Sequence, residues 1–199
     1  MSTDDEKTWL ALGDSYTIGE SVPLHLRWPH QLTRQLGFCN PQYVATTGWT
    51  TFDLLNAISE TTFSPPYTWV SLLIGVNNQY QGLDFSLYPE EFTELLELAI
   101  SQTSNAQHVL VLSIPDYSDT PFAQEKQLKH VQQEVAQYNR TNRQIAEDYG
   151  TRYCDITPIS QLVSENKVLV AEDGLHPSGK MYQSWVEKIR QEIDFTELT

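Results

Sequence analysis

The chain has 199 residues, 40% of them hydrophobic and 11% aromatic, which suffices for one packed α/β domain and is short for two. Its formal net charge is −14, and its 12 basic residues are scattered. Nucleic acids and anionic membrane surfaces are bound through clustered Lys and Arg, so the composition argues against both as partners. We expect one domain over residues 1–199, with residues 1–7 as a flexible tail.

The cysteines do not predict a metal site, and the N-terminal segment does not predict export. Cys39 and Cys154 have no Cys or His at ligand spacing, so no zinc site is expected. Cys154 is expected to be a buried free thiol, although the sequence leaves one disulfide open. Residues 1–7 lack the apolar stretch of a signal peptide, and no later window could span a membrane. We therefore expect a cytoplasmic protein; an export signal that had been removed would not be visible.

Five short stretches predict β-strands. They are residues 8–12, 43–45, 67–74, 108–114 and 152–156. The third is nearly continuous in apolar residues, which is typical of a central strand buried on both faces.

Amphipathic segments lie between and after these strands. The predicted helices are residues 19–37, 52–58, 89–103, 124–149 and 178–193. The first is interrupted or begins near Pro23 and Pro29, and Gly37 ends it. Leu24 and Phe52 are among the residues expected on inner helix faces. Alternation of strands and helices predicts an α/β fold with three layers, α/β/α, around a flavodoxin-like parallel sheet of about five strands.

A Gly13-Asp14-Ser15 turn directly follows the first predicted strand. Ligands of open α/β sheets bind outside the carboxyl ends of the strands, so a hydroxyl at this position faces a substrate. Gly48 and Asn77 follow the second and third strands and should emerge at the same edge. Gly-Asp-Ser is also ordinary turn chemistry, so the turn alone does not establish a site.

A nucleophilic serine needs a base and a group that orients the base. Asp173 and His176 are three residues apart, so one turn can direct the carboxylate at Nδ1–H and leave Nε2 for the Ser15 proton. Acyl transfer also needs donors for the developing oxyanion. The candidates are the backbone N–H groups of Ser15 and Gly48 and the side-chain amide of Asn77.

The order of these motifs resembles the SGNH hydrolases, also called the GDSL esterase/lipase family. Gly-Asp-Ser near the N-terminus, a lone Gly, Gly-x-Asn and Asp-x-x-His span residues 13–176. The resemblance implies a serine hydrolase with Ser15 as nucleophile, His176 as general base and Asp173 as orienting acid. It also implies an oxyanion hole of Ser15, Gly48 and Asn77, and chemistry without a metal or an organic cofactor.

Two residues depart from the family pattern. Tyr16 stands where the family has Leu, and we expect it to pack behind the turn. Asn78 stands where the family commonly has Asp, which leaves the hydrogen bonding of that loop open. Asp14 is expected to bond to the neighbouring loop, and Glu91 to belong to a solvated acidic helix face.

The leading hypothesis is an esterase acting on small to medium acyl esters. Tyr80, Tyr117 and Phe122 should line an apolar acyl or aryl pocket. A carbohydrate O-deacetylase of the same family and a non-catalytic flavodoxin-like binding module remain alternatives. An ordinary α/β-hydrolase is disfavoured because the Gly-x-Ser-x-Gly pattern is not met around Ser15. The natural ester, its acyl length and the oligomeric state do not follow from the sequence.

Overall fold

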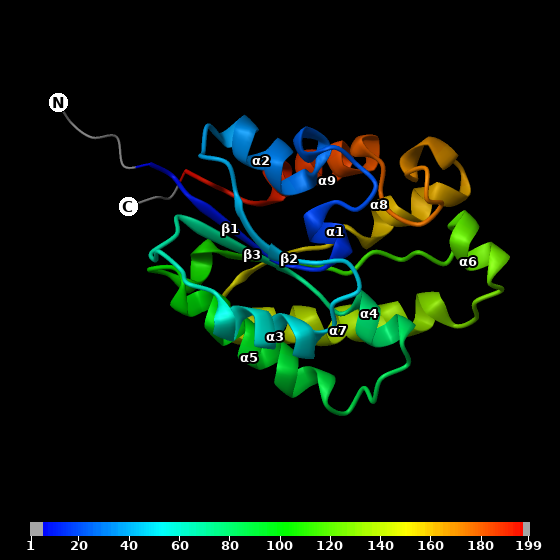
Figure 1. Ribbon diagram of the computed structural model, residues 1–199, viewed down its shortest axis with the longest axis horizontal. Coiled ribbons are helices and arrows are strands. Elements are labelled where there is room, and N and C mark those ends of the chain that lie inside the picture. The colour runs from blue at the N-terminus through cyan, green and yellow to red at the C-terminus, as the bar shows by residue number, and fades with distance from the viewer. Residues whose placement is uncertain (1–5, 197–199) are drawn as a thin grey trace.

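The computed structural model describes residues 6–196, which fold around a five-stranded parallel sheet (Figure 1). The strands are β1 (Trp9–Gly13), β2 (Gln42–Ala45), β3 (Trp69–Leu73), β4 (Val109–Leu112) and β5 (Arg152–Cys154). They lie in the order β2-β1-β3-β4-β5, and every neighbouring pair is parallel. This is the flavodoxin-like topology that the sequence predicts.

The inner strands β1, β3 and β4 are buried at every residue, because they carry mostly apolar side chains on both faces of the sheet and helices cover both faces. Gly13 pairs with Ala45 of β2 and with Leu73 of β3, so these three strands end at the same level. Turns that follow them therefore emerge together at one edge of the sheet.

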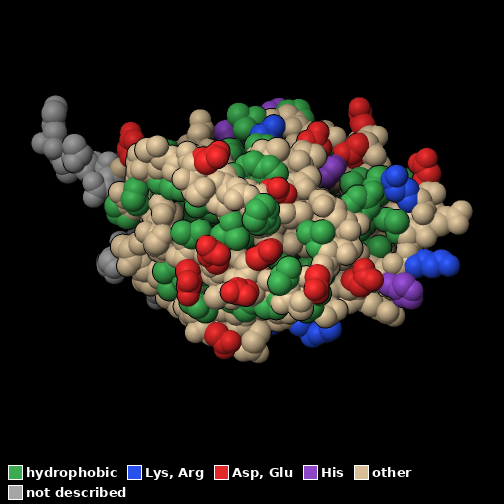
Figure 2. Space-filling view, turned by 60° about the horizontal axis from the view of Figure 1, so that its bottom comes forward, with side chains coloured by type: hydrophobic (Ala, Val, Ile, Leu, Met, Phe, Trp, Pro, Cys, Tyr) green, Lys and Arg blue, Asp and Glu red, His purple; other side chains and the backbone are tan. Residues whose placement is uncertain are grey.

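Helices cover both faces of the sheet (Figure 1). On one face α2 (Trp28–Leu36) packs against α9 (Gly179–Glu192). On the other, α5 (Tyr88–Ser101) packs against both α3 (Thr51–Glu60) and α7 (Val131–Asp148). Figure 2 shows carboxylates spread across this second face, consistent with the acidic composition. The three predicted layers are confirmed.

Short helices surround the carboxyl ends of the strands. They are α1 (Ser15–Ile18), α4 (Val76–Tyr80), α6 (Pro121–Glu125) and α8 (Thr157–Gln161), together with 3₁₀ turns at residues 24–26, 106–108, 162–164 and 167–169. None of the predicted helices includes α4, and the helix predicted over residues 124–149 overlaps only the last two residues of α6. Five residues make little more than one helical turn, which is too short to show an apolar period.

The helix predicted over residues 124–149 begins at Val131 instead. Gln124 and Glu125 end the short helix α6, and the helix does not continue from there because Gln127 and His130 have φ angles of 53° and 65°, in the left-handed region. Gly150, with φ 68°, follows the end of this helix, as predicted.

Two residues predicted on inner helix faces are exposed. Leu24 is 50% exposed because α2 begins only at Trp28, after the extended residue Arg27. Phe52 is 61% exposed because α3 turns Thr51, Leu54 and Ile58 inward.

Both cysteines are free thiols, Cys154 buried and Cys39 exposed, which confirms the prediction for Cys154. Most of the predicted tail lies outside the described residues. Lys7 lies within them, and its carbonyl accepts the Cys39 N–H at 2.9 Å, so the chain is already held there. No helix among residues 6–196 is long and apolar enough to cross a membrane.

Candidate active site

Ser15 is the first residue of α1 and is separated from the end of β1 by Asp14 alone. Asp14 caps this helix: its Oδ1 accepts the Tyr16 N–H at 2.9 Å. The N–H of Ser15 has no acceptor within the helix, because it lies in the first turn. A Cβ at position 13 would collide with the Thr17 side chain and the Leu73 carbonyl, so only glycine permits this tight path. The fold thus places a serine with an available N–H at the edge of the sheet.

Asp173 and His176 form the pair that the sequence predicts. Asp173 Oδ2 accepts from His176 Nδ1 at 2.6 Å and from the Ser21 hydroxyl at 2.6 Å. Its Oδ1 accepts the N–H groups of Leu175 and His176, each at 2.9 Å. Partial burial alone would raise the pKa of Asp173, but these hydrogen bonds outweigh it and lower the pKa to about 2. The ionised carboxylate holds the Nδ1–H tautomer, which leaves Nε2 as an acceptor.

Tyr16 confines the histidine ring. The two ring centroids lie 5.2 Å apart with an interplanar angle of 54°. Tyr16 is 3% exposed, and its carbonyl accepts the Tyr182 hydroxyl of α9 at 3.1 Å. Burial, and then the Asp14 charge, raise the pKa of Tyr16 well above its ordinary value, so the phenol stays neutral. Tyr16 is buried, as the prediction that it packs behind the turn requires, but its ring lies against His176 and borders the pocket.

Gly48 lies in the turn after β2, and Asn77 is the second residue of α4, the short helix that follows β3. Gly48 has φ 87°, a conformation that residues with a Cβ rarely adopt, and a Cβ there would point into open space. Asn77 Nδ2 donates to the Trp49 carbonyl at 2.9 Å, which ties the two segments together. Gln81 Nε2 adds a longer bond to the Gly48 carbonyl at 3.4 Å.

Asp14 lies beneath the site as a buried carboxyl group, 1% exposed. Burial raises its pKa to about 7, although the Tyr16 N–H partly counters this. Asn77 Nδ2 donates to Asp14 Oδ2 at 3.5 Å, the expected bond to the neighbouring segment, and this long, weak bond is the one that an oxyanion would replace. Below pH 7 the uncharged form of Asp14 therefore predominates.

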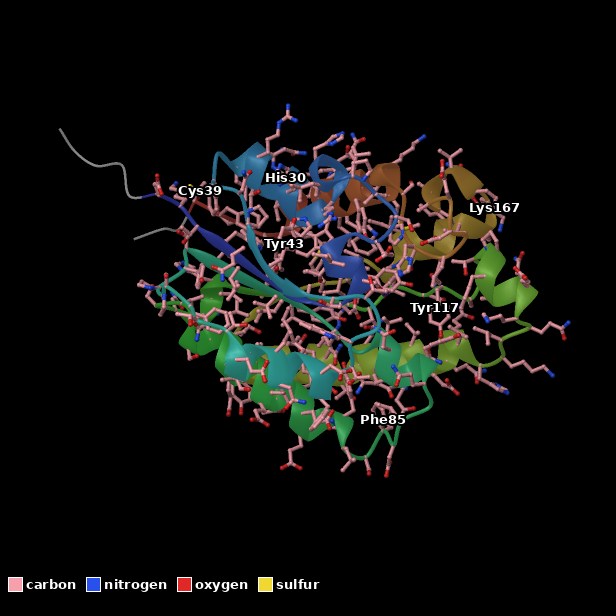
Figure 3. All side chains as sticks on the ribbon, in the orientation of Figure 1. His30, Cys39, Tyr43, Phe85, Tyr117 and Lys167 are labelled. Carbon is pink, nitrogen blue, oxygen red and sulfur yellow. The ribbon has the colours of Figure 1, made fainter. Side chains whose placement is uncertain are left out.

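These turns border one pocket of about 120 Å³. Its lining consists of Ser15, Tyr16, Thr47, Gly48, Val76, Asn77, Tyr80, Tyr117, Phe122, Leu175 and His176. The three predicted aromatic residues form one wall, since Tyr80 lies 5.8 Å from Phe122 and 6.4 Å from Tyr117 between ring centroids. Figure 3 shows Tyr117 beyond the carboxyl ends of the strands, near α6.

Three contributions to the site are not predicted. Ser21 supports Asp173 from 152 residues away along the chain. Gln79 accepts the Tyr117 hydroxyl at 2.6 Å and donates to Glu134 of α7 at 2.7 Å, which fixes the aromatic wall. The Thr47 hydroxyl donates to Glu20 at the rim. No local pattern marks these residues, because each acts through a partner distant in sequence.

The predicted nucleophile, base, orienting acid and oxyanion donors are thus brought together by the fold. The remaining histidines show no ligand spacing in the sequence, and residues 6–196 contain no group of three His, Cys, Asp or Glu side chains able to hold a metal ion. A serine and a histidine that line one pocket, beside a side-chain amide and two backbone N–H groups, are the groups that acyl transfer requires.

Several solved structures share this fold. A lipolytic G-D-S-L family protein from Veillonella parvula is 18% identical, with a TM-score of 0.75 over 92% of this chain and 96% of that one. Axe2, an acetylxylan esterase from Geobacillus stearothermophilus, is 17% identical, with a TM-score of 0.71 and 95% of each chain covered. The esterase EstA from Pseudoalteromonas is 15% identical, with a TM-score of 0.70 over 94% and 97%.

Sequence comparison gives a more specific result. No curated protein sequence matches the chain. Residues 11–184, however, match the GDSL-like Lipase/Acylhydrolase family, a range that includes every candidate residue named above. Because this match extends over most of the sequence, the chain belongs to the GDSL-like lipase/acylhydrolase family.

Proposed function

We propose that the protein hydrolyses carboxylic esters of small to medium acyl groups through an acyl-enzyme on Ser15. The observation that carries the proposal is the shared pocket. Ser15, Gly48, Asn77 and His176 line one cavity, and the Asp173 carboxylate holds the far side of the histidine at 2.6 Å.

In the first half-reaction, His176 Nε2 accepts the proton of Ser15 Oγ while Oγ attacks the ester carbonyl carbon. The carbonyl oxygen becomes an oxyanion that accepts from the N–H groups of Ser15 and Gly48 and from Asn77 Nδ2. Collapse of this intermediate breaks the bond to the alcohol oxygen, which takes the proton from His176. The acyl group stays on Ser15.

In the second half-reaction, His176 removes a proton from water as the water attacks the acyl-enzyme. The same donors stabilise the second oxyanion, and its collapse returns the proton to Ser15 Oγ and releases the carboxylic acid. Asp173 stays ionised throughout, since its pKa of about 2 lies far below neutral pH.

The size of the pocket limits the acyl group. About 120 Å³ is slightly less than the roughly 150 Å³ cavity that accommodates benzene in an engineered protein. Tyr117 is 3% exposed and bonded to Gln79, so it does not yield readily to a longer chain. These features support acetyl, propionyl or similarly small acyl groups.

Hydrolysis of p-nitrophenyl acetate tests the proposal. Ser15→Ala and His176→Ala should each lower kcat on the order of 10⁴–10⁶-fold, as loss of a triad member does in serine hydrolases. Ser59→Ala is the matched control, because Ser59 is exposed on α3 and its hydroxyl donates to the Asn56 carbonyl of the same helix. Undiminished turnover by folded Ser15→Ala protein would exclude Ser15 as the nucleophile.

A carbohydrate O-deacetylase is the second candidate, because an acetyl group fits a pocket of about 120 Å³ and because Axe2, which shares the fold, is an acetylxylan esterase. Rates on acetylated xylan and on p-nitrophenyl esters of increasing chain length separate the two functions. A kcat/KM confined to acetyl groups and higher on the carbohydrate supports deacetylation. Comparable rates on acetyl and butyryl esters of simple alcohols support the general esterase.

A further inference from the structure

We propose that Asn78 is a positioning residue that fixes the spacing between the two separate parts of the oxyanion hole. It acts through a directed chain of hydrogen bonds from Asn78 to Thr51 and from Thr51 to Glu91. The inference rests on the proposed function, because Gly48 and Asn77 are the donors whose spacing is fixed.

Asn78 bonds to two groups of one residue. Its Oδ1 accepts the Thr51 N–H at 3.0 Å, and its Nδ2 donates to Thr51 Oγ1 at 2.6 Å. Asn78 is 3% exposed and Thr51 is fully buried, so water does not compete for these bonds. Two bonds between the same residues fix orientation as well as distance.

This pair of bonds joins the two segments that supply the oxyanion donors. Asn78 follows Asn77 on α4, and Thr51 begins α3, three residues after Gly48. The start of α3 is itself rigid, because Thr50 and Asp53 form a reciprocal capping box. Asn77 bonds to the Trp49 carbonyl in between, so α4 holds the Gly48 turn at successive points.

Spacing matters for this reaction. Donors stabilise an oxyanion when they lie within about 2.7–3.1 Å of its position, and a misplacement of roughly 1 Å can cost about 10²-fold in rate. Gly48 N–H comes from the turn after β2 and Asn77 Nδ2 from α4 after β3, so their separation depends on contacts between these two segments. The Asn78 bonds to Thr51 are buried contacts of this kind.

The direction of the bonds explains why Asn suits this position. A threonine hydroxyl has one proton, and that of Thr51 is donated to Glu91 Oε2 of α5. Thr51 Oγ1 must then be an acceptor toward position 78, which the Asn78 amide satisfies and a carboxylate does not. Glu91 is therefore more than the solvated helix residue that the sequence predicts, and Asn78 and Glu91 form a matched pair.

A double-mutant cycle tests the pairing. Asn78→Asp should lower kcat about 10-fold or more with a smaller change in KM, because the one Thr51 hydroxyl proton cannot serve both the introduced carboxylate and Glu91. Glu91→Gln alone should reduce kcat far less, since a glutamine oxygen still accepts from Thr51. In the double variant the introduced glutamine amide can donate to Thr51, whose hydroxyl then donates to the introduced carboxylate. Most of the lost kcat should therefore return.

The control is Asn56→Asp, which makes the same change of charge at an exposed position of α3 and should leave kcat unchanged. If the Asn78→Asp protein does not fold, Thr51→Ser and Thr51→Val replace it. The serine should retain most of kcat and the isosteric valine should lose it, with both proteins folded by circular dichroism.

Two results overturn the inference. One is an unchanged kcat in folded Asn78→Asp or Thr51→Val protein, and the other is a double variant whose loss equals the product of the two single losses. Failure of the proposed function looks different, because the wild-type protein itself then hydrolyses no ester.

Discussion

Replacing Asp14 with asparagine should change how stability depends on pH. Asp14 is buried beneath the site, and burial raises its pKa from 3.8 to about 7. Between these values the folded protein keeps a proton on Asp14 that the unfolded chain has lost. The free energy of unfolding of the wild type therefore falls as the pH rises from 3.8 to about 7. Above pH 7 Asp14 is ionised in both states, and the free energy of unfolding falls no further on its account.

The shift sets the magnitude. One pKa unit corresponds to about 1.36 kcal/mol, so a rise of roughly three units costs about 4 kcal/mol once Asp14 is ionised. At pH 5 the pH is only a little more than one unit above the unfolded pKa of 3.8, so less than half of this cost has been incurred. The free energy of unfolding should therefore fall by a further amount of about 2.5 kcal/mol between pH 5 and pH 8. Asparagine still caps α1 through its side-chain oxygen and does not titrate.

Urea unfolding at pH 5 and pH 8 measures the effect. The free energy of unfolding of Asp14→Asn minus that of the wild type should be about 2.5 kcal/mol larger at pH 8 than at pH 5. Asp119→Asn, at an exposed aspartate, is the control. If the difference in free energy of unfolding between Asp14→Asn and the wild type is the same at both pH values, the pKa of Asp14 is not raised by burial, and the reasoning is refuted.

Three further predictions follow from the site. Asn77→Ala should lower kcat on p-nitrophenyl acetate about 10²–10³-fold, as loss of one oxyanion donor does; an unchanged rate would remove Asn77 from that role. Phe122→Ala should open the aromatic wall and raise kcat/KM for longer acyl chains relative to acetate, up to about fourfold per methylene, whereas an unaltered chain-length profile would place the acyl group elsewhere. Ser21→Ala removes a hydrogen bond to Asp173, so the pKa of this carboxyl should rise from about 2. The ionised Asp173 stabilises the folded protein, and this stabilisation is then lost at a higher pH. The pH midpoint of acid unfolding should therefore rise, and an unchanged midpoint would contradict the prediction.

The sequence is sufficient to predict the sheet and the main helices. The three central strands are short, mostly apolar runs buried on both faces, so their pattern reflects the packing directly. The rule that parallel strands present their carboxyl ends together places Ser15, Gly48 and Asn77 at one edge before any coordinates are known.

What the sequence does not predict depends on contacts between distant residues. The start of α7 at Val131 follows from left-handed residues before it, which no apolar period reveals. Ser21 reaches Asp173 across the fold, and the chain of hydrogen bonds from Asn78 to Glu91 joins three helices. Such side chains are ordinary polar residues in the sequence and acquire a role only from their partners.

Labelling with a fluorophosphonate probe tests the central claim most directly, because the probe phosphonylates a serine only where a base and an oxyanion hole activate it. Peptide mass spectrometry of the folded protein should find one adduct, on Ser15, and His176→Ala should abolish it. Folded wild-type protein that remains unlabelled at Ser15, or that is labelled on another serine, would contradict the proposed mechanism.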